Sequence, residues 1–310
     1  MTASTSLRAL WRGCMALLAL IPLVALAGAA PDAGKKLKIG VTLHPYYSFV
    51  ANIVGDRADV VPLIPAEANP HNYQPQPDDI TRAMSLDALV VNGIGHDEWA
   101  FQIVKAAGRT QTLPIIQANA SVALIPVGGD QGGVKVVNPH TFVSTTAAIQ
   151  QVFEIARKLG ELDPANAVTY RHNALAYATR IRELRARFMT RFAALDLSGF
   201  RCATTHAGYD YLMQEFGLFV SAVIEPRHGV APTARQLANT IEAIKNAHVR
   251  VLFAEKNFSL DLAKPIEAAT GVKVFALSHI TGSTYSADEF EVAMAENLET
   301  LAEAVEFTQQ

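Results

Sequence analysis

The chain has 310 residues, 50% of them hydrophobic and 18% charged, and a formal net charge of −3 at pH 7. This composition is too apolar for a disordered chain and predicts a packed core, and the length suits two domains of ordinary size. The slightly acidic balance, without a basic cluster, argues against nucleic acid as a partner.

The first thirty residues or so differ in composition from the rest of the chain. Arg8 and Arg12 precede an apolar run over residues 15–27, which ends in the small residues of "ALAGAAPDA". The run is shorter than the roughly 20 apolar residues that a membrane-spanning helix needs, and its ends are typical of a secretory signal peptide. We therefore predict a cleaved signal peptide over residues 1–29. Its removal leaves Cys202 as the only cysteine, so no intramolecular disulfide is expected.

Short apolar segments alternate with amphipathic segments in the part of the chain that follows. Such an alternation predicts βα units and a parallel sheet. We expect strands at residues 37–42, 60–64 and 88–92, and helices at 46–54 and 77–84.

The pattern becomes helical in the middle of the chain, from residue 144 to residue 160. Asp163 and Pro164 then offer a capping residue and a proline for the first turn of a new helix. Residues 165–195 contain neither glycine nor proline. One helix through them would run for roughly 45 Å at about 1.5 Å per residue, so we predict a single long and rigid connection.

After Gly199 the βα alternation resumes to the end of the chain. Strands are expected at residues 200–205, 219–224, 249–254 and 272–277, with helices that begin at 209, cover 234–247, end at 269 and cover 288–307. The predicted fold class is thus α/β, with two βα lobes built on parallel sheets and joined by one long helix. We place the N-terminal lobe at residues 30–160, the linking helix at 161–197 and the C-terminal lobe at 198–310.

Four histidines stand where an expected strand gives way to a loop. His71 and His140 each end an Asn-Pro-His tripeptide, and His206 and His279 follow strands of the second half. Proline fixes the backbone before a histidine, and the carboxyl ends of parallel strands are where ligands bind in such folds. A site in the cleft between the lobes is therefore expected. Spacing alone does not decide between a metal site and ordinary loop histidines, because the chain has neither an HExxH helix nor a CxxC pair.

Five segments resemble, in order, the motifs of one protein family. Together they cover essentially the whole predicted mature chain, and on them the protein resembles the zinc and manganese solute-binding proteins of bacterial ABC importers, the cluster A-I binding proteins. The segments are "NPHNYQPQPDD" from Asn69, "NGIGHDEW" from Asn92, "NPH" from Asn138, "HAGYDYLMQEFGL" from His206 and "FAE" ending at Glu255.

This resemblance implies a periplasmic protein that is not an enzyme. It implies metal ligands at His71, His140 and His206, and a histidine rather than a glutamate in the third position is typical of the zinc importers. Three imidazoles also suit Zn²⁺, whereas Mn²⁺ favours carboxylate oxygen. The implied function is capture of Zn²⁺ as transported ligand and its delivery to the permease of an ABC transporter. We expect a monomer, with a periplasmic metallochaperone as a candidate further partner.

The fourth ligand is not given by the resemblance, because Ser278 stands where the family commonly has an aspartate. His279 is the nearest replacement, Glu255 the second and water the third. Asparagines also replace the acids before both Pro-His pairs. The resemblance therefore does not give the residues that contact and orient the ligand side chains either. Among the other histidines, His44 and His96 follow strands of the first lobe and are candidates for contacts behind the site. His172 and His228 are expected at the surface, and His248 follows an expected helix, with whose dipole it can interact.

Two alternatives remain open from the sequence. Manganese or iron could bind to the same scaffold. Three histidines and a water molecule also form the catalytic arrangement of zinc hydrolases, which require a general base, and Glu255 is the one candidate for that role.

Overall fold

The computed structural model describes residues 36–131, 134–225, 232–256, 263–281 and 284–310. The predicted signal peptide and His228 lie outside these residues. Residues Lys36–Gln310 group into one unit by their mutual contacts. Among the described residues, none of the helices combines the length and the apolar character needed to cross a bilayer.

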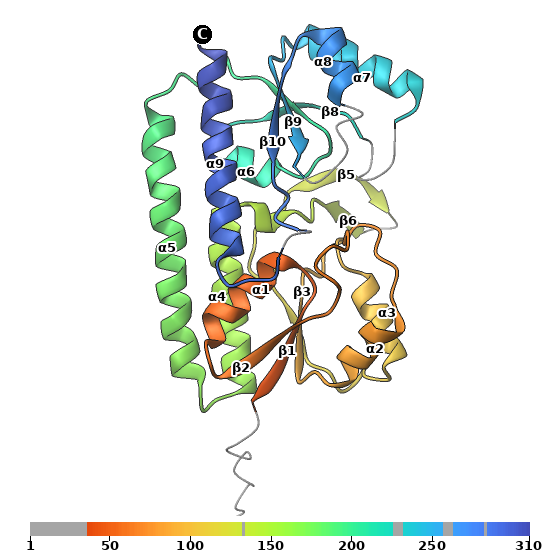
Figure 1. Cartoon of the computed structure of the whole chain (residues 1–310), viewed down its shortest axis with the longest axis vertical. Helices are drawn as coiled ribbons and strands as arrows, with labels where there is room; N and C mark the ends of the chain where they lie inside the picture. The colour runs from red at the N-terminus through yellow and green to blue at the C-terminus, as the bar shows by residue number, and fades with distance from the viewer. Residues whose placement is uncertain (1–35, 132–133, 226–231, 257–262, 282–283) are drawn as a thin grey trace, which may run out of the picture. The chain divides into compact units, whose positions relative to one another are not determined.

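The first sheet has four strands in the order β2-β1-β3-β4, all parallel, and Figure 1 labels the first three of them. All four residues of β3 are buried, as expected for a strand covered on both faces of a parallel sheet. The βα alternation predicted for this part of the chain is confirmed. The elements are β1 (Leu37–Val41), α1 (His44–Val54), β2 (Ala58–Pro62), α2 (Pro77–Met84), β3 (Ala88–Val91), α3 (Trp99–Ala106) and β4 (Ile115–Gln117).

The second sheet also has four parallel strands, in the order β10-β9-β7-β8. Its central strand β9 is buried along its whole length and ends at Glu255. The four strands predicted in the second half are confirmed. The elements are β7 (Cys202–Thr204), α6 (Asp210–Glu215), β8 (Val220–Val223), α7 (Ala234–Asn246), β9 (Val251–Glu255), α8 (Ala263–Thr270) and β10 (Lys273–Leu277).

A short antiparallel pair, β5 (Pro126–Gln131) with β6 (Val134–Val137), stands apart from both sheets. A 3₁₀ turn, η1 (Thr141–Val143), follows it and leads into α4 (Thr145–Leu162). The tripeptide that ends at His140 therefore lies between a strand and a helix start, and both ends of this loop are fixed.

The long helix predicted from the segment without glycine and proline is α5 (Ala167–Ala193), 27 residues long. The predicted cap at Asp163 is wrong, because Asp163 ends α4 and the new helix begins only after Asn166. The Asp163 carboxylate instead accepts hydrogen bonds from the side chains of Asn166 and Tyr170.

Helix α5 lies against α1, α4 and the last helix, α9 (Glu289–Thr308), which runs beside it in Figure 1. Phe49 of α1 contacts Phe290 of α9 with ring centroids 4.9 Å apart, and it contacts Tyr177 of α5 at 6.1 Å. The largest buried apolar cluster includes residues of both sheets and of these helices. Because the halves share this core, the loops at the carboxyl ends of the two sheets are held on one packed framework.

Candidate metal centre

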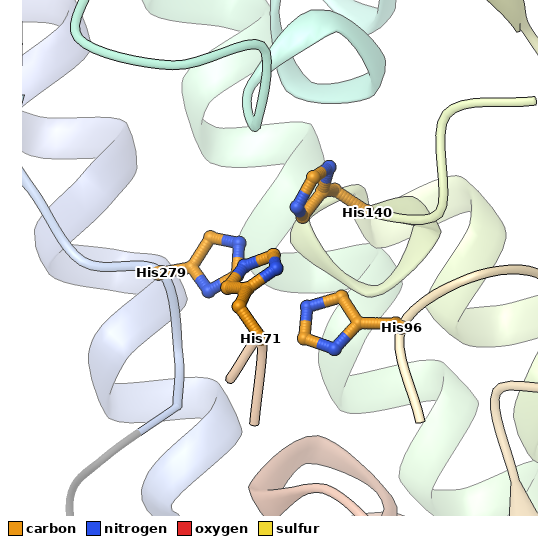
Figure 2. A group of neighbouring side chains, drawn as sticks. All are labelled: His71, His96, His140 and His279. Carbon is orange, nitrogen blue, oxygen red and sulfur yellow. The ribbon is translucent and has the colours of Figure 1, made fainter. Parts of the chain in front are cut away.

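Four imidazole rings converge where loops of the two halves meet (Figure 2). His71, His96, His140 and His279 each offer one ring nitrogen, and these atoms all lie within 4.8 Å of one another. The exposed fractions of His96, His140 and His279 are 3%, 6% and 1%, and His71 is half-buried. An ion bonded at about 2.1 Å needs its ligand atoms within roughly 4.2 Å of one another. Small ring rotations would therefore let all four bind one ion.

His206 lies beside this cluster as a fifth ring. Its centroid is 5.2 Å from that of His140 and 5.1 Å from that of His279. Its Nδ1 atom lies 3.2 Å from Oε2 of Glu255, at the end of β9. Of the four ligands predicted from the sequence, the structure brings His71, His140 and His279 into the cluster of four and places His206 at its edge.

His96 enters the cluster because a tight turn after β3 presents its ring. Asp97, next in the chain, is fully buried and accepts hydrogen bonds from the Thr42 hydroxyl and from the backbone N–H groups of Asn92 and Gly93. Burial is the main reason why the pKa of Asp97 is raised above its ordinary value. From the sequence, His96 was expected to contact residues behind the site and not to be a ligand itself. The signal that identifies it is the buried acid beside it, which closes the turn.

The turn that carries His96 is bonded to the loop that carries His140. The Asn92 side-chain amide donates to the Pro139 carbonyl at 2.9 Å and to the Tyr46 hydroxyl at 3.0 Å. Two of the four rings are thus held relative to each other by buried polar contacts of the protein itself. Such contacts lower the cost of ordering the ligands when an ion binds.

Asn138 orients the ring of His140. Its Oδ1 atom accepts the His140 backbone N–H at 3.0 Å and lies 2.7 Å from the ring Nδ1. If Nδ1 carries the proton in this bond, Nε2 is the nitrogen left for a metal ion. The Asn138 amide also donates to the Ala207 carbonyl and to Asp210. An asparagine can therefore fill this position, where the family resemblance led us to expect an acid.

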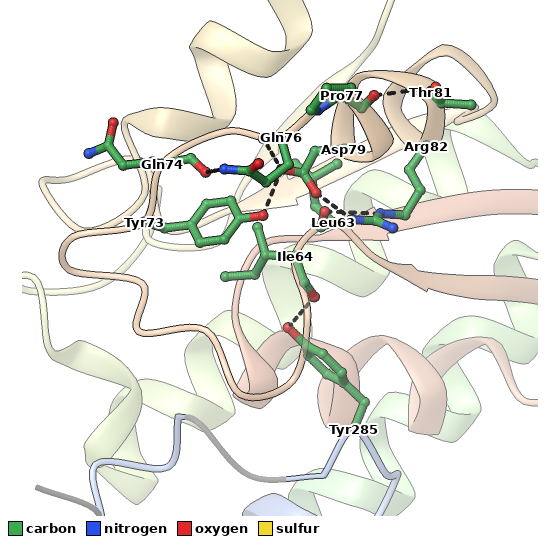
Figure 3. Close-up of polar contacts among 10 residues, drawn as sticks. All are labelled: Leu63, Ile64, Tyr73, Gln74, Gln76, Pro77, Asp79, Thr81, Arg82 and Tyr285. Carbon is green, nitrogen blue, oxygen red and sulfur yellow. Dashed lines mark hydrogen bonds and ion pairs between the residues drawn. The ribbon is translucent and has the colours of Figure 1, made fainter.

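The loop that carries His71 is held at several points. The Asn69 side chain accepts the His71 backbone N–H at 3.0 Å, and the Trp99 indole donates to the Pro70 carbonyl at 2.9 Å. Further along, the buried carboxylate of Asp79 accepts hydrogen bonds from the Tyr73 hydroxyl and the Gln76 N–H and pairs with the Arg82 guanidinium, as drawn in Figure 3.

Among the histidines that the structure describes, His44, His172 and His248 do not join the cluster of four. His44 is buried, its Nε2 atom lies 3.0 Å from the Ala66 carbonyl, and its ring stacks on Tyr285 at 4.0 Å. It therefore contacts the segment before the His71 loop. His172 is exposed, as predicted, and His248 is exposed as well.

The protonation of the site follows from its burial. Burial, and then the neighbouring imidazoles, hold the pKa of His279 well below its ordinary value of 6.5. Burial, and then the charge of Glu225, raise the pKa of Glu255 to about 8. The His279 ring is thus neutral at neutral pH, with a lone pair available, and metal coordination requires this form.

Comparison with known proteins decides the family. Residues 39–304 match the family described as "Zinc-uptake complex component A periplasmic". The chain belongs to this family. Its members are periplasmic metal-binding components of ABC transporters, and they are solute-binding proteins rather than enzymes. The resemblance seen in the motifs is confirmed, and the hydrolase alternative is not supported.

The relatives in and around this family are named for different metals. The "Iron-binding protein YfeA" of Yersinia pestis is 29% identical over 259 residues, 82% of this chain and 81% of its own length. The "Zinc-binding protein AdcA" of Streptococcus pyogenes serotype M1 is 24% identical over 288 residues, 86% of this chain, and the match spans only 55% of AdcA.

Solved structures show the same fold. The solute-binding protein FpvC of Pseudomonas aeruginosa, in complex with Mn²⁺, has a TM-score of 0.84 and 49% identity, with 88% of this chain and 100% of that chain covered. An FpvC complex with Ni²⁺ has a TM-score of 0.83, also at 49% identity. A crystal structure of ZnuA has a TM-score of 0.74 at 24% identity, with 87% of this chain and 100% of that chain covered, and supports the fold alone.

Proposed function

We propose that this protein captures one divalent transition-metal ion with its histidine cluster and delivers it to the permease of an ABC importer, with Zn²⁺ as the cargo. The observation that carries the proposal is the set of four imidazole nitrogens within 4.8 Å of one another. Imidazole suits zinc, iron, nickel and copper, whereas sites for Mn²⁺ are richer in carboxylate and carbonyl oxygen. Four nitrogen donors also match the tetrahedral preference of zinc.

The ligands proposed from the sequence and from the cluster differ in one member. The sequence favours His71, His140, His206 and His279, and the cluster contains His96 in place of His206. We propose His71, His140 and His279 as ligands in either case. His96 is the fourth ligand by distance, and His206, whose ring lies beside the cluster with its Nδ1 atom facing Glu255, is the alternative fourth ligand.

A second candidate cargo is an ion that prefers six ligands, such as Fe²⁺ or Ni²⁺. With His206 beside the cluster of four, five imidazole rings lie close together, which is one more than tetrahedral zinc uses. The similarity to FpvC, solved with Ni²⁺ and with Mn²⁺, and to the iron-binding protein YfeA favours this candidate.

Metal competition, followed by crystallography, tests the proposal. The mature protein, stripped with a chelator, would be offered equimolar Zn²⁺, Ni²⁺, Mn²⁺ and, without oxygen, Fe²⁺, and the bound ion read by native mass spectrometry. We expect one zinc ion per chain, and we expect the other ions not to displace it at equal concentration. Preferential loading with Fe²⁺ or Ni²⁺ would favour the second candidate, and the absence of stoichiometric uptake of any of the ions would overturn both. Anomalous diffraction at the zinc edge then locates the ion among the rings.

The remaining parts of the proposal concern location and partners. We infer that a signal peptide over residues 1–29 is cleaved and that the mature chain works in the periplasm as a monomer. A periplasmic metallochaperone is a proposed source of the ion. N-terminal sequencing of the exported protein and light scattering of the purified chain test the first two points.

A further inference from the structure

The residue after His279 has an unusual backbone conformation. Ile280 has φ of 60°, in the left-handed region, and its side chain is fully buried in the main core. A β-branched residue rarely adopts this conformation, because its side chain crowds the backbone there. Such strain persists only where the surroundings impose it, and it concentrates at ligand-binding positions.

Asn297, in the middle of α9, is hydrogen-bonded to both backbone groups of Ser278, the residue before His279. Its Oδ1 atom accepts the Ser278 N–H at 2.7 Å, and its Nδ2 atom donates to the Ser278 carbonyl at 2.8 Å. Asn297 is only 1% exposed. A buried amide is costly unless it is hydrogen-bonded, so these two bonds account for an asparagine on the buried face of a helix.

Two further contacts complete the turn. The Ser278 hydroxyl accepts the Ile280 N–H at 3.0 Å. On the far side, the buried Thr281 places its Oγ1 atom 3.0 Å from Nδ1 of His279. The backbone before the ring and the ring itself are thus fixed, and Nε2 of His279 is the nitrogen left for the cluster.

Helix α9 also connects this turn to the other half of the molecule. Its residue Phe290 donates its backbone N–H to the Ser48 hydroxyl of α1 at 3.3 Å, and α9 packs on α1, α5 and β10. His71, His96 and His140 come from the half that contains α1. The helix that holds Ser278 therefore sets the position of His279 relative to the three other rings.

We propose that Asn297 is a positioning residue of the metal site, which holds the strained turn at Ile280 and thereby aims His279 at the ion. This inference rests on the proposed function, because it concerns the same site. A purely structural role, the fastening of β10 to α9, is the competing explanation. If Asn297 is a positioning residue, its substitution changes metal affinity only when His279 is present. If its role is purely structural, the substitution has the same effect on metal affinity with and without His279.

A double-mutant cycle separates these explanations. Zinc affinity would be measured by competition with a chelating dye for the wild type, Asn297→Ala, His279→Ala and the double variant, and unfolding temperatures would be measured without metal. We expect Asn297→Ala to weaken zinc binding at least about 10-fold, as is usual for residues behind a metal ligand. In the His279→Ala background it should change affinity less than about twofold, while its effect on unfolding temperature persists in both backgrounds.

Controls make each outcome informative. Asn173→Ala removes a side-chain bond to a backbone carbonyl, that of Ile53, between α5 and α1, and should leave zinc affinity unchanged. Asn297→Leu, close in size, replaces the alanine variant if that one does not fold. An equal loss of affinity in both His279 backgrounds, or none in either, would overturn the inference. Failure of the wild type to bind metal would instead overturn the proposed function.

Discussion

His206 and Glu255 face each other at the carboxyl edge of the second sheet, with Nδ1 of the imidazole 3.2 Å from Oε2 of the carboxylate. Both side chains are almost completely buried, and the pKa of Glu255 is raised to about 8 by burial first and the charge of Glu225 second. Below this pKa the Glu255 carboxyl group is neutral in the metal-free protein. A cation bound nearby favours the ionised carboxylate, so metal binding and proton release from Glu255 are linked.

The first prediction concerns Glu255→Gln. Because the folded-state pKa of about 8 exceeds the ordinary value of 4.5, the folded chain keeps a proton that the unfolded chain loses between these pH values. The acid therefore lowers stability as pH rises through that window. Glutamine does not titrate, so the metal-free variant should be more stable than the wild type at pH 8, by up to about 4 kcal/mol, and equal to it near pH 4.

Calorimetry at the two pH values checks the sign of this effect on stability. Titration of the same variant with zinc measures how much the substitution weakens metal binding. Loss of the compensating charge should weaken zinc binding about 10-fold, the usual effect of a residue behind a ligand. Glu267→Gln, on the exposed part of α8, serves as the control. A stability gain that is the same at pH 4 and pH 8 would show that titration of Glu255 is not its cause.

The second prediction concerns pH and the imidazoles. The folded-state pKa of His279 lies well below 6.5, by burial first and the neighbouring rings second. Below pH 6.5 the unfolded chain gains a proton at this residue that the folded chain does not, so the stability of the metal-free protein falls as pH falls. Zinc-bound rings must also be neutral, and protons therefore compete with zinc. Zinc affinity should be lower at pH 5 than at pH 7.5, and equal affinities in calorimetric titration would contradict this.

The third prediction separates the two proposed ligand sets. His96→Ala should weaken zinc binding more than about 100-fold, beyond the 10–100-fold typical of a residue behind a ligand, and His206→Ala should fall within that lower range. The reason is that His96 belongs to the cluster whose ligand atoms lie within 4.8 Å of one another, and His206 does not. His172→Ala, an exposed residue of α5, should have no effect. The reverse order of the two losses would restore the ligand set expected from the sequence.

Much of the fold follows from local patterns. The absence of glycine and proline over residues 165–195 is sufficient for one long helix, and the observed α5, Ala167–Ala193, falls short of that segment by only two residues at each end. The start of the helix was predicted wrongly because Asp163 is a good capping residue in isolation. In the folded chain its carboxylate bonds to Tyr170 instead, and this choice depends on tertiary packing.

The candidate site was predictable as a set of histidines but not as a geometry. Asn-Pro-His and the ends of strands identify His71, His140 and His279 from residue type and local position. His96 needed knowledge of the turn closed by Asp97, whose bond to Thr42 joins residues 55 positions apart. A contact of this range leaves no periodic signal in the sequence. The same holds for Asn297, which meets Ser278 only after α9 has packed beside β10.

The last prediction concerns the loop that carries His71. Asp79 is fully buried, and its carboxylate receives the Tyr73 hydroxyl and the Gln76 N–H at 2.7 Å each and also pairs with Arg82. Asparagine has one acceptor oxygen and no charge, so Asp79→Asn should lower the free energy of unfolding by about 2 kcal/mol, the range for hydrogen bonds to a charged group.

The same substitution should loosen the loop before it unfolds the protein. Amide hydrogen exchange should become faster at residues 69–76, and zinc affinity should fall several-fold, because part of the binding energy must then order His71. Asp56→Asn is the matched control, since the Asp56 side chain is 85% exposed and pairs only at the surface with Arg57. A uniform rise in exchange over the whole chain, without a larger change at 69–76, would show that Asp79 stabilises the fold and does not act on the site.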